Sequence, residues 1–380
     1  MNAVRHWAVA AALTLLAGCA VAPVVDRAPP WEDLAFGYDA ALVTVGKAEL
    51  FALDAQLLRE AQALGLQRLG SSLRLDAMMQ WVYGADRARF HYLAGHSTGA
   101  AETWRQRRGD CLSLTILTYA VARSLGLDAQ MQEVRLPAMY DRRDGFDYVN
   151  RHVNLVVGVL NRDPLVEVLQ RQEIAIDFEP EYGTHLRGKP LTEDAVLARF
   201  YNNVGVEHLA RGDRRGAYAH FKAAMLADRG YSAPYGNLAL LYREGKLDAP
   251  AEQLLRQAIV LAEEPDVPMR ALHRLLVDQG RTVEALAYGE RLRTRQEDDP
   301  YWWISQGIRH LADGEPRKAL VALQQAGRIT SGFGEVHRFL ALAYWQLGER
   351  TRADEQLALL TEVDPNNVGA AKLRRKFRAP

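Results

Sequence analysis

The spacing of apolar residues predicts three helices in the first part of the chain. Apolar positions recur every three or four residues over 47–65 and again over about 73–83. A third such stretch runs from Cys111 to Leu125 and stops at Gly126, a residue type that commonly follows a helix end. This third helix is apolar on nearly every side, so we expect it in the middle of a domain.

The pattern then changes to that of strands. Residues 152–157 and 173–178 are rich in β-branched side chains. In the second stretch the apolar residues share one face of the strand and leave Asp177 on the other. Helices followed by strands predict an α+β domain over residues 47–190.

From about residue 198 the sequence repeats every 34 residues. One column of the repeat is alanine, at Ala217, Ala251, Ala285, Ala319 and Ala353. A small-residue column holds Gly205, Ala239, Gly307 and Ala341, interrupted by His273, and a large-residue column holds Phe221, Leu255, Leu323 and Leu357, interrupted by Gly289. Small residues let paired helices approach closely, and large residues fill the space between pairs. An unrelated helical bundle would not keep this phase.

This period and pattern resemble those of tetratricopeptide repeats. The resemblance implies five repeats within residues 191–369, beginning near 198, 232, 266, 300 and 334. It further implies an all-α superhelix that binds a protein partner.

The composition narrows the class of protein. The 380 residues are enough for two domains, and 48% apolar with 25% charged residues is ordinary for a globular chain. Lys plus Arg and Asp plus Glu balance at 47 each, so no net charge directs the protein to nucleic acid. Beyond the N-terminal stretch no apolar run approaches the roughly 20 residues that cross a bilayer.

The first 19 residues carry an export pattern. Arg5 precedes an apolar run over residues 7–17, and small residues lead to Cys19. The tetrapeptide Leu-Ala-Gly-Cys ending at Cys19 resembles the lipobox of bacterial lipoproteins. That resemblance implies a signal peptide over residues 1–19 and lipidation of Cys19. Ala20, in place of an aspartate, implies the outer membrane, facing the periplasm; the alternative for this stretch is a buried helix.

Two further segments flank the predicted domains. Residues 20–46 contain three prolines and no clear period, which predicts a tether. Residues 370–380 form a basic tail, either the solvated face of a helix that caps the repeats or a contact to anionic lipid headgroups. Its cations are Lys372, Arg374, Arg375, Lys376 and Arg378.

Cys111 is a candidate nucleophile. With Cys19 lipidated it would be the one remaining cysteine, in an oxidising compartment. It begins the predicted buried helix, where backbone N–H groups and the helix dipole favour a thiolate. Asp110 opposes this with a negative charge, which Arg107 and Arg108 could offset. Such a thiol needs a base that a third group orients.

His152 and Asp177 are the candidates for those two roles. Among the histidines of this domain (His91, His96, His152 and His185), His152 opens a strand, which can aim a side chain. Asp177 lies on the polar face of the next predicted strand. Antiparallel pairing with His152 directly opposite Asp177 would place the turn between Asn161 and Val168, where turn-forming residues occur.

These residues resemble the transglutaminase-like superfamily, within the papain-like fold. The resemblance rests on Gly109-Asp110-Cys111, Arg151-His152-Val153 and Ile176-Asp177-Phe178, with support from residues 101–105. It implies that Cys111 attacks an amide carbonyl to give a thioester, that His152 moves the proton and that Asp177 orients the imidazole, with no cofactor. Leu112 stands where animal transglutaminases carry Trp, a departure that disfavours protein cross-linking and leaves the bacterial hydrolase-like branch open. Whether water or an amine resolves the thioester stays open.

Other interpretations of these residues remain. Cys111 could be an inert core cysteine, His152 a structural histidine and Asp177 a surface acid, which would make the domain a non-catalytic, peptide-binding scaffold of the envelope. A zinc site is disfavoured because the nearest ligand pair, His91 with His96, has no neighbouring cysteine.

The repeats predict a basic groove. If the first helix of each pair lines a concave face, repeat positions 2, 5, 9 and 12 face the groove. They hold one acid, Glu335, and the candidate partner-binding residues Arg199, Arg243, Arg270, Arg274 and Arg338. An apolar floor is predicted from Val206, Leu240, Ile304, Ile308, Leu311 and Trp345. Guanidinium groups suit a peptide segment that bears carboxylates, although Glu244 and Asp278 could neutralise two of them.

Overall fold

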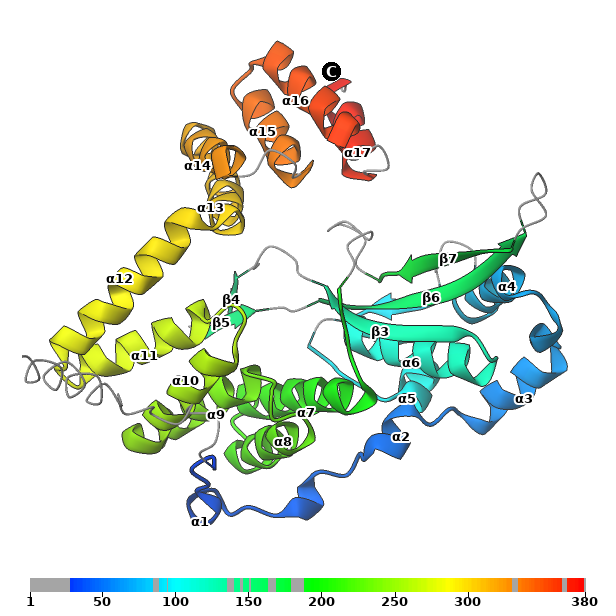
Figure 1. Ribbon diagram of the computed structural model, residues 1–380, viewed down its shortest axis with the longest axis horizontal. Coiled ribbons are helices and arrows are strands. Elements are labelled where there is room, and N and C mark those ends of the chain that lie inside the picture. The colour runs from blue at the N-terminus through cyan, green and yellow to red at the C-terminus, as the bar shows by residue number, and fades with distance from the viewer. Residues whose placement is uncertain are drawn as a thin grey trace, which may run out of the picture.

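The computed structural model describes a half of mixed helices and strands followed by an arc of paired helices (Figure 1). It describes residues 28–84, 89–93, 95–134, 140–143, 146–149, 152–162, 169–178, 188–329, 334–363 and 368–378. In the view of Figure 1 the arc runs from α7 round to α17, and the strands of the first half lie on its inner side.

Two of the three helices predicted for the first half are confirmed, and one is split. The helices are α1 (Asp33–Phe36), α2 (Lys47–Phe51), α3 (Ala55–Ala63), α4 (Ser71–Tyr83), α5 (Ala100–Gln106) and α6 (Cys111–Ser124), with short 3-10 turns η2 (Ala40–Leu42) and η3 (Leu66–Arg68). The helix predicted over 47–65 breaks after α2 because Asp54 caps α3, accepting a hydrogen bond from the N–H of Gln56. Helix α6 is buried on nearly all sides, as its apolar sequence predicted.

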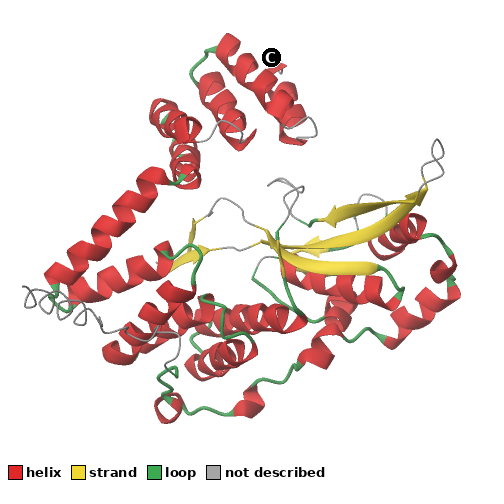
Figure 2. Cartoon of the chain, in the orientation of Figure 1, coloured by secondary structure: helices red, strands yellow, loops and turns green. Residues whose placement is uncertain are grey.

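One four-stranded antiparallel sheet lies over α6 (Figure 2). Its order is β7-β6-β3-β8, and the strands are β3 (Asp128–Val134), β6 (His152–Arg162), β7 (Leu169–Ile176) and β8 (Lys189–Pro190). Two smaller pairs are parallel β1 (His91–Tyr92) with β2 (Arg108–Gly109), and antiparallel β4 (Tyr140–Arg143) with β5 (Phe146–Val149).

The predicted antiparallel pairing of β6 with β7 is confirmed, but its register is wrong. Leu155 pairs with Ile176, and this register extended by one residue puts Asp177 level with Asn154 rather than with His152. The shift is two residues, which leaves every side chain on its predicted face of the sheet. Residues 163–168, which belong to the predicted turn, lie outside the described residues.

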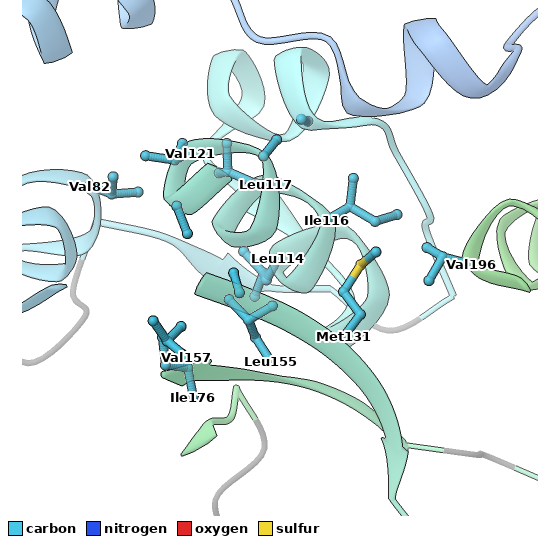
Figure 3. Close-up of a cluster of buried hydrophobic side chains, with 14 of the residues drawn as sticks. Val82, Leu114, Ile116, Leu117, Val121, Met131, Leu155, Val157, Ile176 and Val196 are labelled. Carbon is cyan, nitrogen blue, oxygen red and sulfur yellow. The ribbon is translucent and has the colours of Figure 1, made fainter. Parts of the chain in front are cut away.

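The core of the first half lies between α6 and the sheet. Figure 3 shows Leu114 of α6 beside Leu155 of β6, whereas Leu117 and Val121 lie on the side of the helix away from the strands. Leu117 and Leu155 are fully buried. Burial of one such side chain contributes roughly 1.5–3 kcal/mol to folding, so this buried cluster is a main source of stability.

The first repeat helix belongs to the same core. Side chains from the loop before α7, from α7 itself and from α8 join the cluster around α6: Leu191, Val196, Leu197, Phe200, Tyr201 and Ala224. Val196 appears beside Met131 of β3 in Figure 3. The predicted boundary near residue 190 is therefore no linker, because the repeat half supplies part of the core of the first half.

In the described part of the second half, the chain forms five helix pairs and a final helix. The pairs are α7 (Glu193–Ala210) with α8 (Arg214–Ala227), α9 (Ala233–Glu244) with α10 (Asp248–Leu261), α11 (Asp266–Asp278) with α12 (Thr282–Asp298), α13 (Pro300–Ala312) with α14 (Pro316–Ile329), and α15 (Gly334–Gln346) with α16 (Arg350–Val363). Helices α9, α11, α13 and α15 begin at or beside the predicted starts, whereas α7 begins before residue 198.

The small and large columns of the repeat meet as predicted. A Cβ atom on Gly205 would lie 2.6 Å from the ring of Phe221, and one on Gly307 would lie 2.5 Å from Leu323. In the third repeat the two sizes are exchanged: His273 fills the small column and approaches to 3.5 Å from where a Cβ on Gly289 would lie. The two interruptions in the sequence pattern thus compensate each other in volume.

The described part of the predicted tether packs against the repeats. We call residues 28–46 the N-terminal strap. Its Phe36 ring stacks on Tyr218 of α8 at 4.9 Å and on Tyr242 of α9 at 5.4 Å. Lys222 of α8 donates to both carboxylate oxygens of Asp33, at 2.7 and 2.8 Å. The aromatic residues of the strap do not recur at a helical or strand spacing, so the sequence did not predict this contact.

The strap carboxylate and the repeat hydroxyls perturb each other. Burial alone would raise the pKa of Asp33, but hydrogen bonds from Lys222 and Tyr218 lower it below its usual value. Burial and the bond to Asp33 raise the pKa of Tyr218, and burial raises the pKa of Tyr242 to about 12. Both tyrosines are therefore neutral donors at ordinary pH, and they hold the strap through Asp33 and the Pro30 carbonyl oxygen.

The basic C-terminal region forms a helix on the last repeat. Helix α17 (Val368–Arg378) packs Leu373 and Phe377 against the array, and the Phe377 ring stacks on Trp345 at 5.5 Å. Lys372, Arg374, Arg375 and Lys376 are exposed. Within the described ranges, no helix combines the length and apolarity that crossing a membrane requires.

Candidate functional site

Cys111 is the first residue of α6 and is partly exposed. Asp110 caps the helix: it accepts hydrogen bonds from the N–H of Ser113 at 2.8 Å and from the hydroxyl of Ser113 at 2.6 Å. The Ser97 hydroxyl donates to its other oxygen at 2.5 Å. Burial raises the pKa of Asp110, while these bonds lower it. The nucleophile candidate thus begins a firmly capped helix beside a buried carboxyl.

The two arginines expected to offset Asp110 have other contacts. The Arg107 guanidinium stacks on the Trp104 ring at 3.3 Å, and Arg108 donates to the side chain of Gln106. Serine hydroxyls and a backbone N–H therefore stabilise the Asp110 carboxyl. Arg107 has a φ of 54°, in the left-handed region, where it ends α5.

His152 and Asp177 are brought together as predicted. His152 Nε2 lies 2.6 Å from Asp177 Oδ1, and both side chains are almost fully buried. The contact forms although the residues are not directly opposite, because a diagonal pair across two strands is still within side-chain reach. An acceptor on Nε2 fixes the ring orientation and makes Nδ1 the nitrogen that would take a proton from a thiol.

Two further polar residues hold Asp177, and the sequence analysis missed them. Asn154 donates to Asp177 Oδ2 at 3.1 Å, and Gln132 donates to Asn154 Oδ1 at 2.9 Å. The N–H of Gly188 donates to Gln132 Oε1 at 2.9 Å. The chain of bonds crosses the sheet from β7 to the residue before β8. A signal was present: Asn154 is a polar residue in an apolar strand, two positions from His152 and on its face.

The chain path brings Cys111 and His152 to one end of the domain. Helix α6 is about 20 Å long, and β3 runs back along it over about the same length. The end of β3 therefore lies level with the start of α6, and Val134 at that end pairs with His152. One turn along α6 from Cys111, the Thr115 hydroxyl donates to the carbonyl oxygen of Val153 at 3.2 Å.

Among the described residues no group of three or more His, Cys, Asp or Glu side chains could hold a metal ion. His96 lies 3.9 Å from Glu207 of α7, and His91 is exposed on β1. His185 and the lipidation candidate Cys19 lie outside the described residues.

The predicted groove arginines differ widely in their surroundings. Arg199 does not line an open groove: it is buried, and it pairs with Glu133 of β3. Arg243 pairs with Asp278 at 2.5 Å, the neutralisation that the sequence suggested, and Arg338 lies 3.7 Å from Glu335. Arg270 is half-buried and Arg274 is exposed.

The predicted apolar floor is only partly open. Ile304 and Leu311 are buried in the core between helices. Four others are half-buried and can still line a surface: Val206, Leu240, Ile308 and Trp345. The count of repeat positions therefore assigned two core residues, Ile304 and Leu311, to the groove floor.

Comparison with known proteins concerns the second half of the chain. A family model described as tetratricopeptide repeat matches residues 310–377. The second half is built of tetratricopeptide repeats. The five helix pairs at the predicted period, with their small and large columns in contact, extend that assignment back to α7.

Solved structures align with about half of the chain at low identity. YrrB, described as a repeat protein with an unusual peptide-binding site, is 18% identical over 47% of this chain and 92% of its own, with a TM-score of 0.26. MamA is 20% identical over 48% and 97%, with a TM-score of 0.24. PilF of Pseudomonas aeruginosa is 16% identical over 50% and 96%, with a TM-score of 0.27. No curated protein matches the chain.

Proposed function

We propose that the first half is a thiol-dependent, transglutaminase-like domain that acts on amide bonds, and that the repeats bind its protein partner. The observation that carries this proposal is the buried His152–Asp177 pair, 2.6 Å apart, at the end of the domain where Cys111 begins α6. A buried ion pair of this kind gives little net stability, whereas an oriented imidazole is what a nucleophilic thiol requires.

In the proposed reaction the thiol adds to an amide carbonyl. The Cys111 sulfur forms a bond to the carbonyl carbon, and the thiol proton passes to Nδ1 of His152. The C–N bond then breaks, and His152 gives the proton to the leaving amine, which leaves a thioester. The N–H of Cys111 would stabilise the oxyanion. Water resolves the thioester in a hydrolase, and a second amine resolves it in an acyl transferase.

Alkylation of Cys111 at low pH tests the proposal. At pH 5.5 an ordinary thiol is only about 0.1% thiolate. An ion pair with His152 would populate the thiolate there, and we expect iodoacetamide to modify Cys111 about tenfold faster than N-acetylcysteine, after allowing for the weaker nucleophilicity of a low-pKa thiolate. Mass spectrometry of the labelled peptide measures the rate.

Two variants control the experiment. His152→Ala should abolish the excess rate, and His91→Ala, an exposed histidine of the same half, should leave it unchanged. A rate equal to that of N-acetylcysteine in the unaltered protein would favour the alternative, a non-catalytic peptide-binding scaffold of the envelope.

For the repeats we propose a partner segment that bears carboxylates. Arg270 and Arg274 of α11 lie one helical turn apart, so both guanidinium groups can reach one short peptide. Arg270→Glu with Arg274→Glu should abolish capture from an array of acidic peptides at low salt. Arg317→Glu with Arg328→Glu on α14 makes the same charge change outside the proposed groove and should leave capture unchanged. Equal losses of peptide capture in the two variants would mean that net charge, and not the proposed groove, determines binding.

We further propose that Cys19 is lipidated and anchors the protein in the outer membrane, facing the periplasm. The lipobox-like tetrapeptide and Ala20 support this. Cys19→Ser should leave the precursor uncleaved, because the sulfur is the attachment point, and immunoblots of membrane fractions measure cleavage and location. Recovery of the variant processed and membrane-bound would contradict the proposal. Several acyl chains would be needed, since one chain binds a bilayer only marginally.

A further inference from the structure

Helix α7 presents three polar side chains in one stripe to the first half of the chain. Arg199, Asn203 and Glu207 are spaced four residues apart, so they lie on one face of the helix. Each contacts a residue of the first half: Arg199 binds Glu133, Asn203 donates to the Ser97 hydroxyl at 3.0 Å, and Glu207 accepts from the Ser97 N–H at 2.9 Å. We call these three residues the α7 stripe.

One end of the α7 stripe supports the strand that holds the imidazole. Arg199 Nε donates to Glu133 Oε2 at 2.9 Å, and the guanidinium lies over the ring of Tyr231 at 4.4 Å. Glu133 follows Gln132 in β3, and Gln132 is the residue that binds Asn154, the donor to Asp177. The ion pair therefore fixes β3 where the network of the imidazole begins.

The other end supports the first turn of α6. Ser97, held by Asn203 and Glu207, donates to Asp110, the residue before Cys111. The next N–H along the chain, that of Thr98, donates to the Ser113 hydroxyl at 2.8 Å, and Ser113 is the residue that Asp110 caps. The segment at Ser97 is thus bound on one side to α7 and on the other to the turn that carries the thiol.

A buried carboxyl group, Asp110, and a half-buried one, Glu207, make this connection sensitive to position. Burial raises the pKa of Asp110, and burial together with the charge of Asp110 raises the pKa of Glu207. The hydrogen bonds of Ser97 lower the pKa of both groups, and so does the nearby charge of His96. A buried carboxylate that loses a donor is costly, so Ser97 is held where both groups need it.

We propose that Arg199, Asn203 and Glu207 are positioning residues for the thiol and imidazole, so that the first tetratricopeptide repeat is a structural part of the candidate site. The same helix also contacts the next repeat: Asn237 of α9 donates to Asn202 of α7 at 2.8 Å. The expected effect on Cys111 reactivity rests on the proposed thiol function. The contacts of the α7 stripe with the first half do not depend on that function.

Adjacent asparagines of α7 provide a matched test in the full chain. Asn203→Ala removes the bond to Ser97, and Asn202→Ala removes the bond to Asn237. In Asn203→Ala we expect amide hydrogen exchange of residues 111–115 to quicken about fivefold, the factor for one lost hydrogen bond. We also expect the pH midpoint of Cys111 alkylation to rise toward that of an ordinary thiol. In Asn202→Ala both quantities should stay as in the unaltered protein.

The two readouts separate the inference from the proposed function. If the unaltered protein shows no low-pH alkylation, the thiol function fails and hydrogen exchange alone decides the inference. Unchanged exchange of residues 111–115 in Asn203→Ala overturns the inference, whatever Cys111 does. Equal quickening in Asn202→Ala also overturns it, because the effect would then be a general loosening of the first repeat.

Discussion

Replacing Asp177 by asparagine removes the reactivity of Cys111 at low pH. The amide keeps the shape of the carboxyl but not its charge, so an imidazolium at His152 loses the partner that stabilises it. The thiol then returns to ordinary ionisation, and we expect alkylation at pH 5.5 to fall about tenfold. The rate of iodoacetamide labelling against pH measures the change.

One control changes another carboxylate of the same sheet, and the other changes both members of the His152–Asp177 pair. Asp128→Asn removes an exposed carboxylate of β3 that pairs with Arg171, and it should leave the rate unaltered. The double variant His152→Ala with Asp177→Asn should react no more slowly than either single variant, because the two residues act as one unit. A further drop in the double variant would mean that Asp177 influences the thiol by a route other than the imidazole.

Replacing Arg199 by methionine destabilises the whole chain. The change takes the cation from a buried ion pair and leaves the Glu133 charge poorly compensated inside the interface between the two halves. Removing one member of a buried pair costs about 3–5 kcal/mol. We expect a loss of that size in the free energy of unfolding, measured by denaturant titration.

Arg243→Met is the matched variant for that measurement. Its pair with Asp278 is more exposed, so its removal should cost less than about 1 kcal/mol. Similar losses for the two arginines would contradict the assignment of Arg199 to a buried interface. A large loss of unfolding free energy for Arg199→Met alone would indicate that Arg199 is a buried interface residue. It would then not be the groove residue that its repeat position had predicted.

The sequence carried enough information for most helices and strands and for the contact of His152 with Asp177, but not for every pairing. The 34-residue period predicted the helix pairs because each repeat must present small and large residues at fixed positions. The His152–Asp177 contact was predicted although the register was off by two residues. Hydrophobic alternation fixes which face a side chain takes, and a slip of two residues keeps that face.

What the sequence did not show arises from contacts between distant segments. Strand β3 alternates apolar residues with Gln130 and Gln132. Gln132 is buried and binds Asn154, but from the sequence alone it resembles a surface residue such as the exposed Gln130. Arg199 has the repeat position of a groove residue, and only the docking of β3 on α7 makes it internal. The strap binds through Phe36 and Asp33, whose partners lie far away in the chain.

The core shared by α6, the sheet and α7 also sets an order of events during synthesis. Phe200, Tyr201 and Ala224 belong to the core of the first half but follow residue 190 in the chain. At about 5–20 residues per second, residue 224 is added roughly 2–7 seconds after residue 190. During that interval the apolar faces of α6 and β3 have no cover from α7 and α8. The first half therefore cannot finish folding ahead of the repeats, and the nascent chain is most exposed to aggregation just before its first repeat is complete.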